Sequence, residues 1–256
     1  MTFKSIIGLR LIAPAKTTIL LSVVFFFAAF VQDTSAQRKF SRTYPAGQDV
    51  RLNLMNRTGT VEVEGWNRRE INIVATMEAP AAIIEPQSTL DLIEINMVRD
   101  NQGRDVGNVN FKVRVPYNTV VDIETRIGNL SVTSVRSGLV RAYISSEGDI
   151  TLTNIVATNV SAENRLGDIF FDGQISENGL YRFSSMSGRI ALRIPFASSF
   201  RLVATAPSTR SISLGSFSNG DTNFVGDGRR VLGKFGTGSA SVTVTNKLGS
   251  IAFFGR

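Results

Sequence analysis

A short pattern that recurs about every 20 residues constrains the fold of this chain more than any other feature. The pattern is a glycine, a small or polar residue, a β-branched residue or leucine, any residue, and a further apolar residue. From Gly128 it recurs after 20, 19, 21 and 22 residues. The fourth of these steps reaches Arg210, where the glycine itself is missing, and the pattern occurs once more at Gly249. Internal repeats of this length are typical of folds in which one supersecondary unit stacks on the next.

Each repeat predicts a strand, a tight turn and a second strand. Apolar residues alternate with other residues on both sides of the turn, which is the pattern of half-buried strands. Because glycine has no Cβ, it reaches the positive φ that a sharp corner between strands often requires. The turn glycines are Gly59, Gly128, Gly148, Gly167, Gly188 and Gly249.

Stacked repeats, or rungs, would bury their apolar positions in continuous ladders at a spacing of ~4.8 Å. Burial of each such side chain contributes roughly 1.5–3 kcal/mol. We therefore predict an all-β protein, a single β-solenoid (β-helix-like) domain of strand–turn–strand repeats. The two predicted ladders are Leu130, Ile150, Ile169 and Ile190, and Val132, Leu152, Phe171 and Leu192.

The mature domain is expected to span residues 37–256. Regular repeats cover residues 119–254, whereas residues 70–116 break the period and predict longer, irregular strands. We expect this irregular segment to form sheet over the first rungs, with a hairpin insertion as the alternative.

The first 36 residues predict a secretory signal peptide. Three basic residues precede the apolar run Ile19–Val31, and Thr34 and Ala36 supply the small residues of a cleavage site. The run has 13 residues, fewer than the roughly 20 that span a hydrocarbon core, so an uncleaved anchor is the less favoured alternative. We predict export to the periplasm, the outer surface or the medium.

The absence of two residue types excludes several classes of enzyme. The 256 residues include no His and no Cys, which excludes Ser-His-Asp and Cys-His catalysis, imidazole and thiolate metal sites, and disulfides. The formal charge is +7, but the basic residues are scattered and no nucleic-acid-binding motif accompanies them. We expect neither an enzyme nor a nucleic-acid-binding protein.

One stretch resembles a known family. Residues 61–71, VEVEGWNRREI, are similar to the N-terminal signature of the DUF4097 family of adhesin-like proteins, also grouped with toastrack-like envelope domains. The segments Ser146–Ile150 and Leu192–Pro195 are similar to that family's pattern too, and the resemblance covers most of residues 45–254. It implies an all-β, solenoid-like domain on exported or membrane-attached bacterial proteins, with no established catalytic residues. The missing glycine at Arg210 departs from the pattern.

Two carboxylates, Asp149 and Asp168, follow turn glycines on neighbouring rungs. A separation of about 5 Å would be near that of retaining glycosidases, so a β-solenoid that binds or cleaves carbohydrate is the alternative function. Asp also favours turns because its side chain bonds nearby backbone N–H groups, and Arg189 on the next rung would keep Asp168 charged. We expect the turn role, with divalent-cation binding as a further alternative; we predict no catalytic residue, cofactor or metal ligand.

Basic residues recur two positions before the turn glycine, at Arg57, Arg126, Arg165 and Lys247. This basic stripe is a candidate site for an anionic envelope polymer or lipid. A solvated edge, whose arginine stems cover the side of the domain, is the alternative that we favour. Trp66, the only tryptophan, is expected to seal the first rung, with a platform for stacking sugars as the alternative.

These features predict a non-catalytic interaction module of the cell envelope, either an adhesin or a structural or stress-sensing partner. A rigid solenoid offers long, repetitive faces that suit extended partners. The expected partners are envelope or surface proteins, or anionic envelope polymer. The apolar C-terminal segment Ala252–Phe254 further predicts an open strand edge through which two copies could associate.

Overall fold

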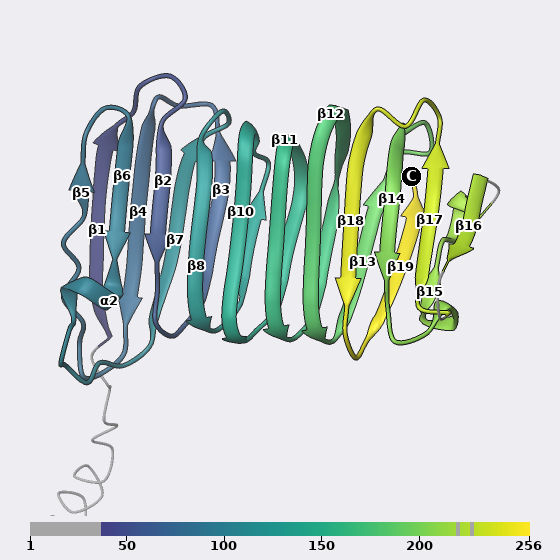
Figure 1. Ribbon diagram of the computed structural model, residues 1–256. Coiled ribbons are helices and arrows are strands. Elements are labelled where there is room, and N and C mark those ends of the chain that lie inside the picture. Colours follow the sequence, from purple (N-terminus) through teal and green to yellow (C-terminus); the bar gives the residue numbers. More distant parts are fainter. Residues whose placement is uncertain (1–36, 219–220, 226–227) are drawn as a thin grey trace, which may run out of the picture. The chain divides into compact units, whose positions relative to one another are not determined.

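The protein is built almost entirely from β-strands (Figure 1). The computed structural model describes residues 37–218, 221–225 and 228–256, so the predicted signal peptide, residues 1–36, lies outside the described residues. The helical elements in the described part are three short segments, α2 (Met97–Asp100), η1 (Thr209–Ser211) and η2 (Gly215–Phe217). None of the helices described has the length and apolar character needed to cross a membrane. The prediction of an all-β chain is confirmed.

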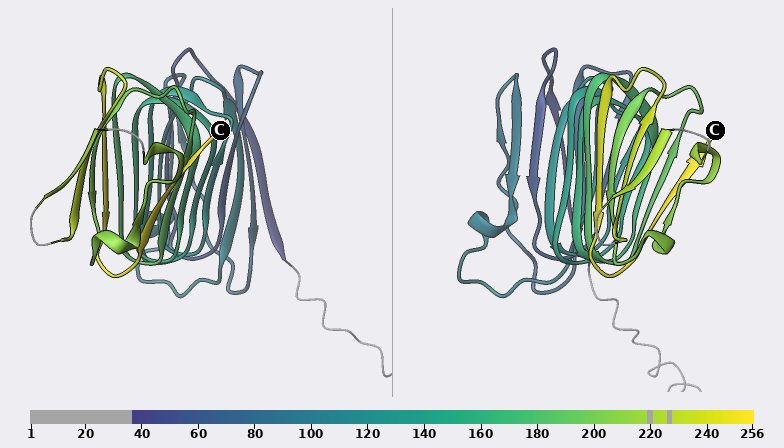
Figure 2. Two further views of the ribbon diagram at one scale, coloured as in Figure 1. Left: turned by 90° about the vertical axis from the view of Figure 1, so that its right-hand side faces the viewer. Right: turned by 45° about the vertical axis from the view of Figure 1, so that its right-hand side comes forward.

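The middle of the chain stacks in parallel, each unit beside the next, as both views in Figure 2 show. Its strands are β8 (Val120–Ile127), β9 (Leu130–Thr133), β10 (Arg136–Glu147), β11 (Ile150–Leu166), β12 (Ile169–Ser187) and β13 (Arg189–Ile194). The long strand β11 serves two layers, because its first part pairs with β9 and its second part with β10. Ile150 lies between Leu130 and Ile169, so the predicted register is found here.

At the N-terminal end the chain does not stack in sequence order. The pair β2 (Arg51–Met55) and β3 (Val61–Trp66) lies between β8 and β9 on one side and β6 (Leu92–Asn96) and β7 (Val109–Pro116) on the other. The sheet is extended by β4 (Glu70–Met77), antiparallel to β7, and by β1 (Arg38–Pro45), antiparallel to β4. A short strand, β5 (Gln87–Ser88), pairs with β6. The irregular segment thus supplies the rung outside β2 and β3.

The C-terminal end repeats this arrangement. The last strands, β18 (Ala240–Asn246) and β19 (Ser250–Gly255), lie between the pair β12 and β13 and the pair β14 (Phe200–Thr205) and β15 (Ile212–Ser213). In Figure 1, yellow β18 stands between green β12 and β14. Antiparallel β17 (Arg230–Phe235) and β16 (Asp221–Val225) continue the sheet beyond β14.

The prediction of an open apolar edge at Ala252–Phe254 is therefore wrong. Strand β19 pairs in parallel with β13 along its length and, on its other side, with the two-residue strand β15 at Ile251 and Ala252. Ala252 and Phe253 are buried, and Phe254 points to the outer surface of the sheet with 41% of its area exposed. The apolar segment that looks like a free edge in the sequence is thus paired with β13 throughout and covered at Ala252 by β15.

Inward-facing side chains form the predicted ladders and extend them over the out-of-order rungs. Val61 lies beside Leu130, and Ile251 lies beside Ile190, all of them buried. At the C-terminal end the core is closed by a cluster of rings, with centroids 4.6 Å apart for Phe200 and Phe235 and 5.7 Å apart for Phe200 and Phe217. These aromatic rings cover the apolar interior at the end of the stack, where no further rung of the described chain follows.

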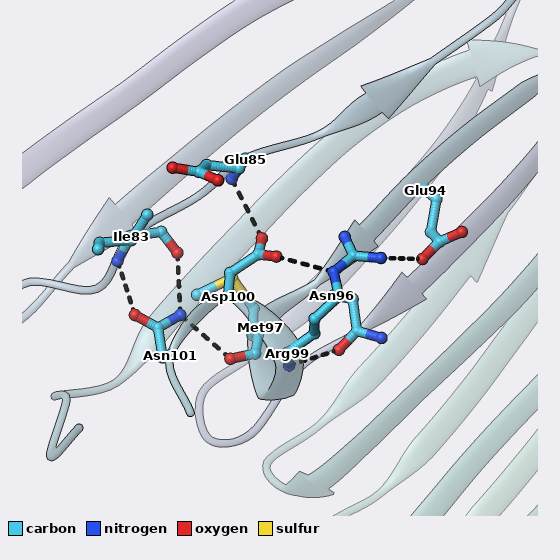
Figure 3. Close-up of polar contacts among 8 residues, drawn as sticks. All are labelled: Ile83, Glu85, Glu94, Asn96, Met97, Arg99, Asp100 and Asn101. Carbon is cyan, nitrogen blue, oxygen red and sulfur yellow. Dashed lines mark hydrogen bonds and ion pairs between the residues drawn. The ribbon is translucent and has the colours of Figure 1, made fainter. Parts of the chain in front are cut away.

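The N-terminal end is closed by α2 and the segment before β5 (Figure 3). Buried Asn101 accepts a hydrogen bond from Ile83 N (2.8 Å) and donates to the carbonyl oxygens of Ile83 (2.9 Å) and Met97 (3.1 Å). Asp100 and Glu94 both bind Arg99, at 3.2 and 2.6 Å. Desolvation opposes the charge on Arg99, but these two carboxylates outweigh it and raise the pKa of its guanidinium. This network fixes the loop over the core residue Met97.

Candidate functional site

The turn glycines line one edge of the stack, which we call the glycine corner. Five of them have positive φ, between 107° at Gly59 and 146° at Gly148. A Cβ on Gly148 would overlap the carbonyl oxygen of Gly128 on the adjacent rung, so the rungs approach too closely there for any side chain. Gly249 does not share the positive φ, but a Cβ on it would overlap the carbonyl oxygen of Gly188. These positions therefore require glycine for two reasons: the positive φ at five of them, and the close approach of the backbone of the adjacent rung.

Polar side chains next to the glycines join each rung to the following one. Asn129 Oδ1 accepts from the backbone N–H of Asp149 at 2.9 Å, and Asp149 Oδ1 accepts from that of Asp168 at 2.7 Å. Asp168 Oδ1 in turn accepts from the N–H of Arg189 at 2.7 Å. The carboxylates of Asp149 and Asp168 thus lie on neighbouring rungs, and each accepts a hydrogen bond from the backbone of the next rung. Across the part of the chain that the structure describes, no group of three or more acidic side chains is arranged to hold a metal ion.

A second polar column, inside the glycine corner, escaped the sequence analysis. Buried Asn164 donates to the carbonyl oxygens of Gly148 (3.2 Å) and Gly167 (2.9 Å), and buried Asn246 donates to that of Gly188 (2.8 Å). The signal for it was present, since a polar residue stands three positions before every turn glycine. These residues are Asn56, Thr125, Ser145, Asn164, Ser185 and Asn246.

The basic stripe lies along the glycine corner, but it is not continuous. Arg126, Arg165 and Lys247 are exposed, whereas Arg57 is half-buried and donates to the carbonyl oxygen of Arg104 at 3.0 Å. The rungs between them carry Ser146 and Met186 at the same position, and the acidic residues Glu147, Asp149 and Asp168 share the edge. The stripe therefore alternates with acidic and neutral groups.

A different hollow, of about 550 Å³, lies where β3, β7 and β9 end, and we call it the arginine pocket. Backbone hydrogen bonds draw its corners together, because Tyr117 N donates to Trp66 O (3.2 Å) and Arg136 N donates to Tyr117 O (2.6 Å). Its principal side chains are Trp66, Arg68, Arg69, Tyr117, Asn118 and Arg136. No feature of the repeat pattern pointed to this group, since its residues come from three separate turns.

Trp66 fixes one wall of the arginine pocket. Its Nε1 donates to the carbonyl oxygen of Glu70 at 2.8 Å, and the Arg68 guanidinium carbon lies 4.9 Å from the centre of its ring. The ring is half-buried, and β3 pairs with strands on both sides. Trp66 therefore does not seal the first rung, as the sequence analysis expected, but stands at a corner of the second.

An ion-pair cluster marks the outer surface of β12. The carboxylate of Asp172, 5% exposed, binds the Arg193 guanidinium through Oδ2 and lies 3.3 Å from Arg256 Nη1 through Oδ1. The hydrogen bond from Asp172 and its negative charge raise the pKa of Arg193. Because both arginines are substantially exposed and bind the same carboxylate, this cluster anchors the C-terminal residue rather than forming a reactive site.

No protein-family profile and no curated protein sequence matches the chain. Among solved structures, it is similar to a "putative cell adhesion protein" from Clostridium sporogenes, with 11% identity over 85% of this chain and 97% of that one, and a TM-score of 0.47. It is also similar to a "putative adhesin" from Bacteroides fragilis, with 7% identity over 86% and 98% of the two chains and a TM-score of 0.35. A third is a "putative lipid binding protein" from Parabacteroides distasonis, with 9% identity over 84% and 96% and a TM-score of 0.34.

Proposed function

We propose that this protein is a non-catalytic interaction module of the exported cell envelope. In this proposal the signal peptide is cleaved after Ala36, and residues 37–256 act as one rigid β-solenoid that displays its outer faces to envelope or surface molecules. The resemblance to the DUF4097 family belongs to the same proposal. Stacked rungs suit this role because they repeat the same side-chain positions along a surface, which matches extended or repetitive partners.

The observation that carries the proposal is the use of Asp149 and Asp168. A general acid must present a free proton to a substrate, and a nucleophile must present a free oxygen. Here one oxygen of each carboxylate accepts a backbone N–H from the next rung at 2.7 Å. This hydrogen bond gives each carboxylate a structural role, and we favour that role over the carbohydrate-cleaving alternative because it accounts for both residues without a substrate.

Two copies could associate only through a strand edge that is free, and the free edge is not the expected one at the C-terminal strand. On its outer side, β1 has no pairing partner among the described strands, whereas β19 is enclosed. Arg38, Lys39 and Arg42 lie along β1. Basic side chains on an edge strand oppose pairing with a second copy, so we favour partners that bind the faces or corners of the stack.

The test is photo-cross-linking in the native host with the full chain. A cross-linking residue replaces Thr153 on the outer surface of β11, and the same variant without irradiation is the control. We expect envelope protein or polysaccharide to be captured only after irradiation. Recovery of the protein in the cytoplasm, or no captured molecule, would contradict the proposal.

The mature N-terminus is tested in the same preparation. We expect mass spectrometry of the envelope fraction to find Gln37 as the first residue. An intact segment Met1–Arg10 on membrane-associated protein would instead support the uncleaved anchor.

A further inference from the structure

The arginine pocket has an excess of positive charge. Arg68 is paired with Glu70 at 3.3 Å, but the exposed side chains of Arg69 and Arg136 have no acidic partner within ion-pair distance in the described part of the chain. The carboxylate of Asp49 accepts from Asn118 Nδ2 at 3.1 Å, beside the pocket. Two guanidinium groups are therefore available to an anion at this corner.

An aromatic ring orients one of the two available guanidinium groups, that of Arg136. Arg136 lies over the ring of Tyr117, 5.7 Å from its centre, as Arg68 lies over Trp66. A guanidinium stacked on a ring keeps its N–H edge free, and that edge matches the two oxygens of a carboxylate. The rings are also partly exposed, 39% in the case of Tyr117, and offer apolar surface next to the charges.

The remaining polar groups of the pocket are amides. Gln48, Asn67 and Asn118 line it, and a side-chain amide both donates and accepts hydrogen bonds, as a sugar hydroxyl does. Charges, ring faces and amides in one hollow of about 550 Å³ fit a ligand with an anionic group, C–H surface and hydroxyls.

We propose that the arginine pocket binds an acidic saccharide, with a sugar carboxylate held by Arg69 and Arg136. This inference rests on the proposed interaction role and names the class of ligand for it. It goes beyond the basic stripe, because three acidic residues share the edge of the stripe, whereas none is among the residues that line the arginine pocket.

The experiment uses the full chain and the fluorescence of Trp66, which is the only tryptophan and so reports on the pocket alone. The probe is a hexamer of galacturonic acid, and the control ligand is the same hexamer with methyl-esterified carboxylates. We expect a saturable change with the acid and binding at least about tenfold weaker with the ester, because charged hydrogen bonds are lost.

Paired variants locate the binding site. The double variant Arg69→Gln and Arg136→Gln should bind the acidic hexamer at least about tenfold more weakly. The control double variant Arg182→Gln and Arg201→Gln removes the same charge from exposed positions on β12 and β14, and should bind within about twofold of the parent. Thermal melting of both variants verifies that they are folded.

Three results would overturn the inference: no saturable signal with the acid, equal binding of the ester, or equal weakening in both double variants. The proposed function fails separately, in the cross-linking experiment. If envelope partners are still captured by the Arg69→Gln and Arg136→Gln variant, the pocket is not the binding site while the interaction role stands.

Discussion

The middle of this protein and its two ends are built from the same rungs but assembled by different rules. In the middle, strands β8 to β13 pair with one another in sequence order, each with a strand one repeat away along the chain. At the ends the strands pair out of sequence order. The pair β2 and β3 lies between β6 and β7 and the middle of the stack, and the pair β18 and β19 lies between the middle of the stack and β14 and β15. The middle is a local arrangement that could be lengthened, whereas the ends are non-local arrangements that terminate the stack.

The contrast between the middle and the ends shows how a stack of rungs avoids an open end. A last rung with unpaired N–H and C=O groups and an apolar interior would recruit another chain. Here the outermost positions are occupied by short or antiparallel strands, by α2 and by the phenylalanine cluster. The N-terminal strand β1 is one of these outer antiparallel strands, whereas the C-terminal strand β19 pairs with both β13 and β15.

Ending the chain after Gly238 tests this comparison most severely. It removes β18 and β19, and so removes the parallel partners of β12, β13, β14 and β15 together. We expect loss of more than the ~5–15 kcal/mol that stabilises a typical domain, seen as insoluble protein or a lost cooperative melt. Deleting residues 38–45, the edge strand β1, should cause a far smaller decrease in melting temperature. Similar effects of the two deletions would mean that β19 is not interior.

A charge in the middle ladder should have the next largest effect. Ile150→Asp places a carboxylate between Leu130 and Ile169, where no partner exists for it, and should destabilise the protein by about 4 kcal/mol or more. Thr151→Asp, one residue on and facing outward, should change the free energy of unfolding by about 1 kcal/mol or less. Urea denaturation measures both, and equal midpoints would argue against an inward-facing Ile150.

A substitution at the C-terminal end of the stack should loosen only the strands near it, whereas one in the middle should affect the whole domain. Phe217→Ala removes a ring packed against Phe200, Phe235 and Phe253, and should cost about 3 kcal/mol. We expect hydrogen exchange to increase in β14, β17 and β19 and to remain slow in β10 and β11. An equal increase in all strands would show that the end and the middle unfold as one unit.

The glycine corner should tolerate no methyl group. Gly148→Ala combines a positive φ with overlap on Gly128, and we expect a loss of about 2 kcal/mol in the free energy of unfolding. Gly138→Ala is the control, because its φ is ordinary and no atom lies within 4 Å of the added Cβ. Thermal melting that ranks Gly138→Ala as the worse variant would refute the role of close rung approach.

The smallest effect concerns the corner carboxylates. Asp149→Ala removes the acceptor for the N–H of Asp168 and should cost about 1 kcal/mol. Asp149→Asn keeps an oxygen in that place and should be close to neutral, with binding to envelope partners unchanged. A loss of polysaccharide turnover in Asp149→Asn would restore the enzymatic alternative.

Much of the fold was predictable from the chain because the repeat is periodic in two ways. Alternation with a period of two marked Leu130, Ile150 and Ile169 as inward residues, and the 20-residue spacing placed them opposite one another. Turn glycines were recognisable because few residues fit a sharp corner. The inner polar column at Asn164 and Asn246 was visible as a pattern, but its meaning needed the carbonyl oxygens of the corner, which no sequence displays.

The geometry of one rung can be read from the chain: which residues face inward, where the chain turns, and that one rung stacks on the next. The order of rungs at the ends, and the grouping of Trp66, Tyr117 and Arg136 in one pocket, become visible in the folded domain alone. The physical reason is that every rung presents the same apolar pattern, so Ile251 and Ile212 fit equally well beside Ile190 as far as local sequence is concerned. The choice between them depends on closing both ends of the core at once, which is a property of the whole domain.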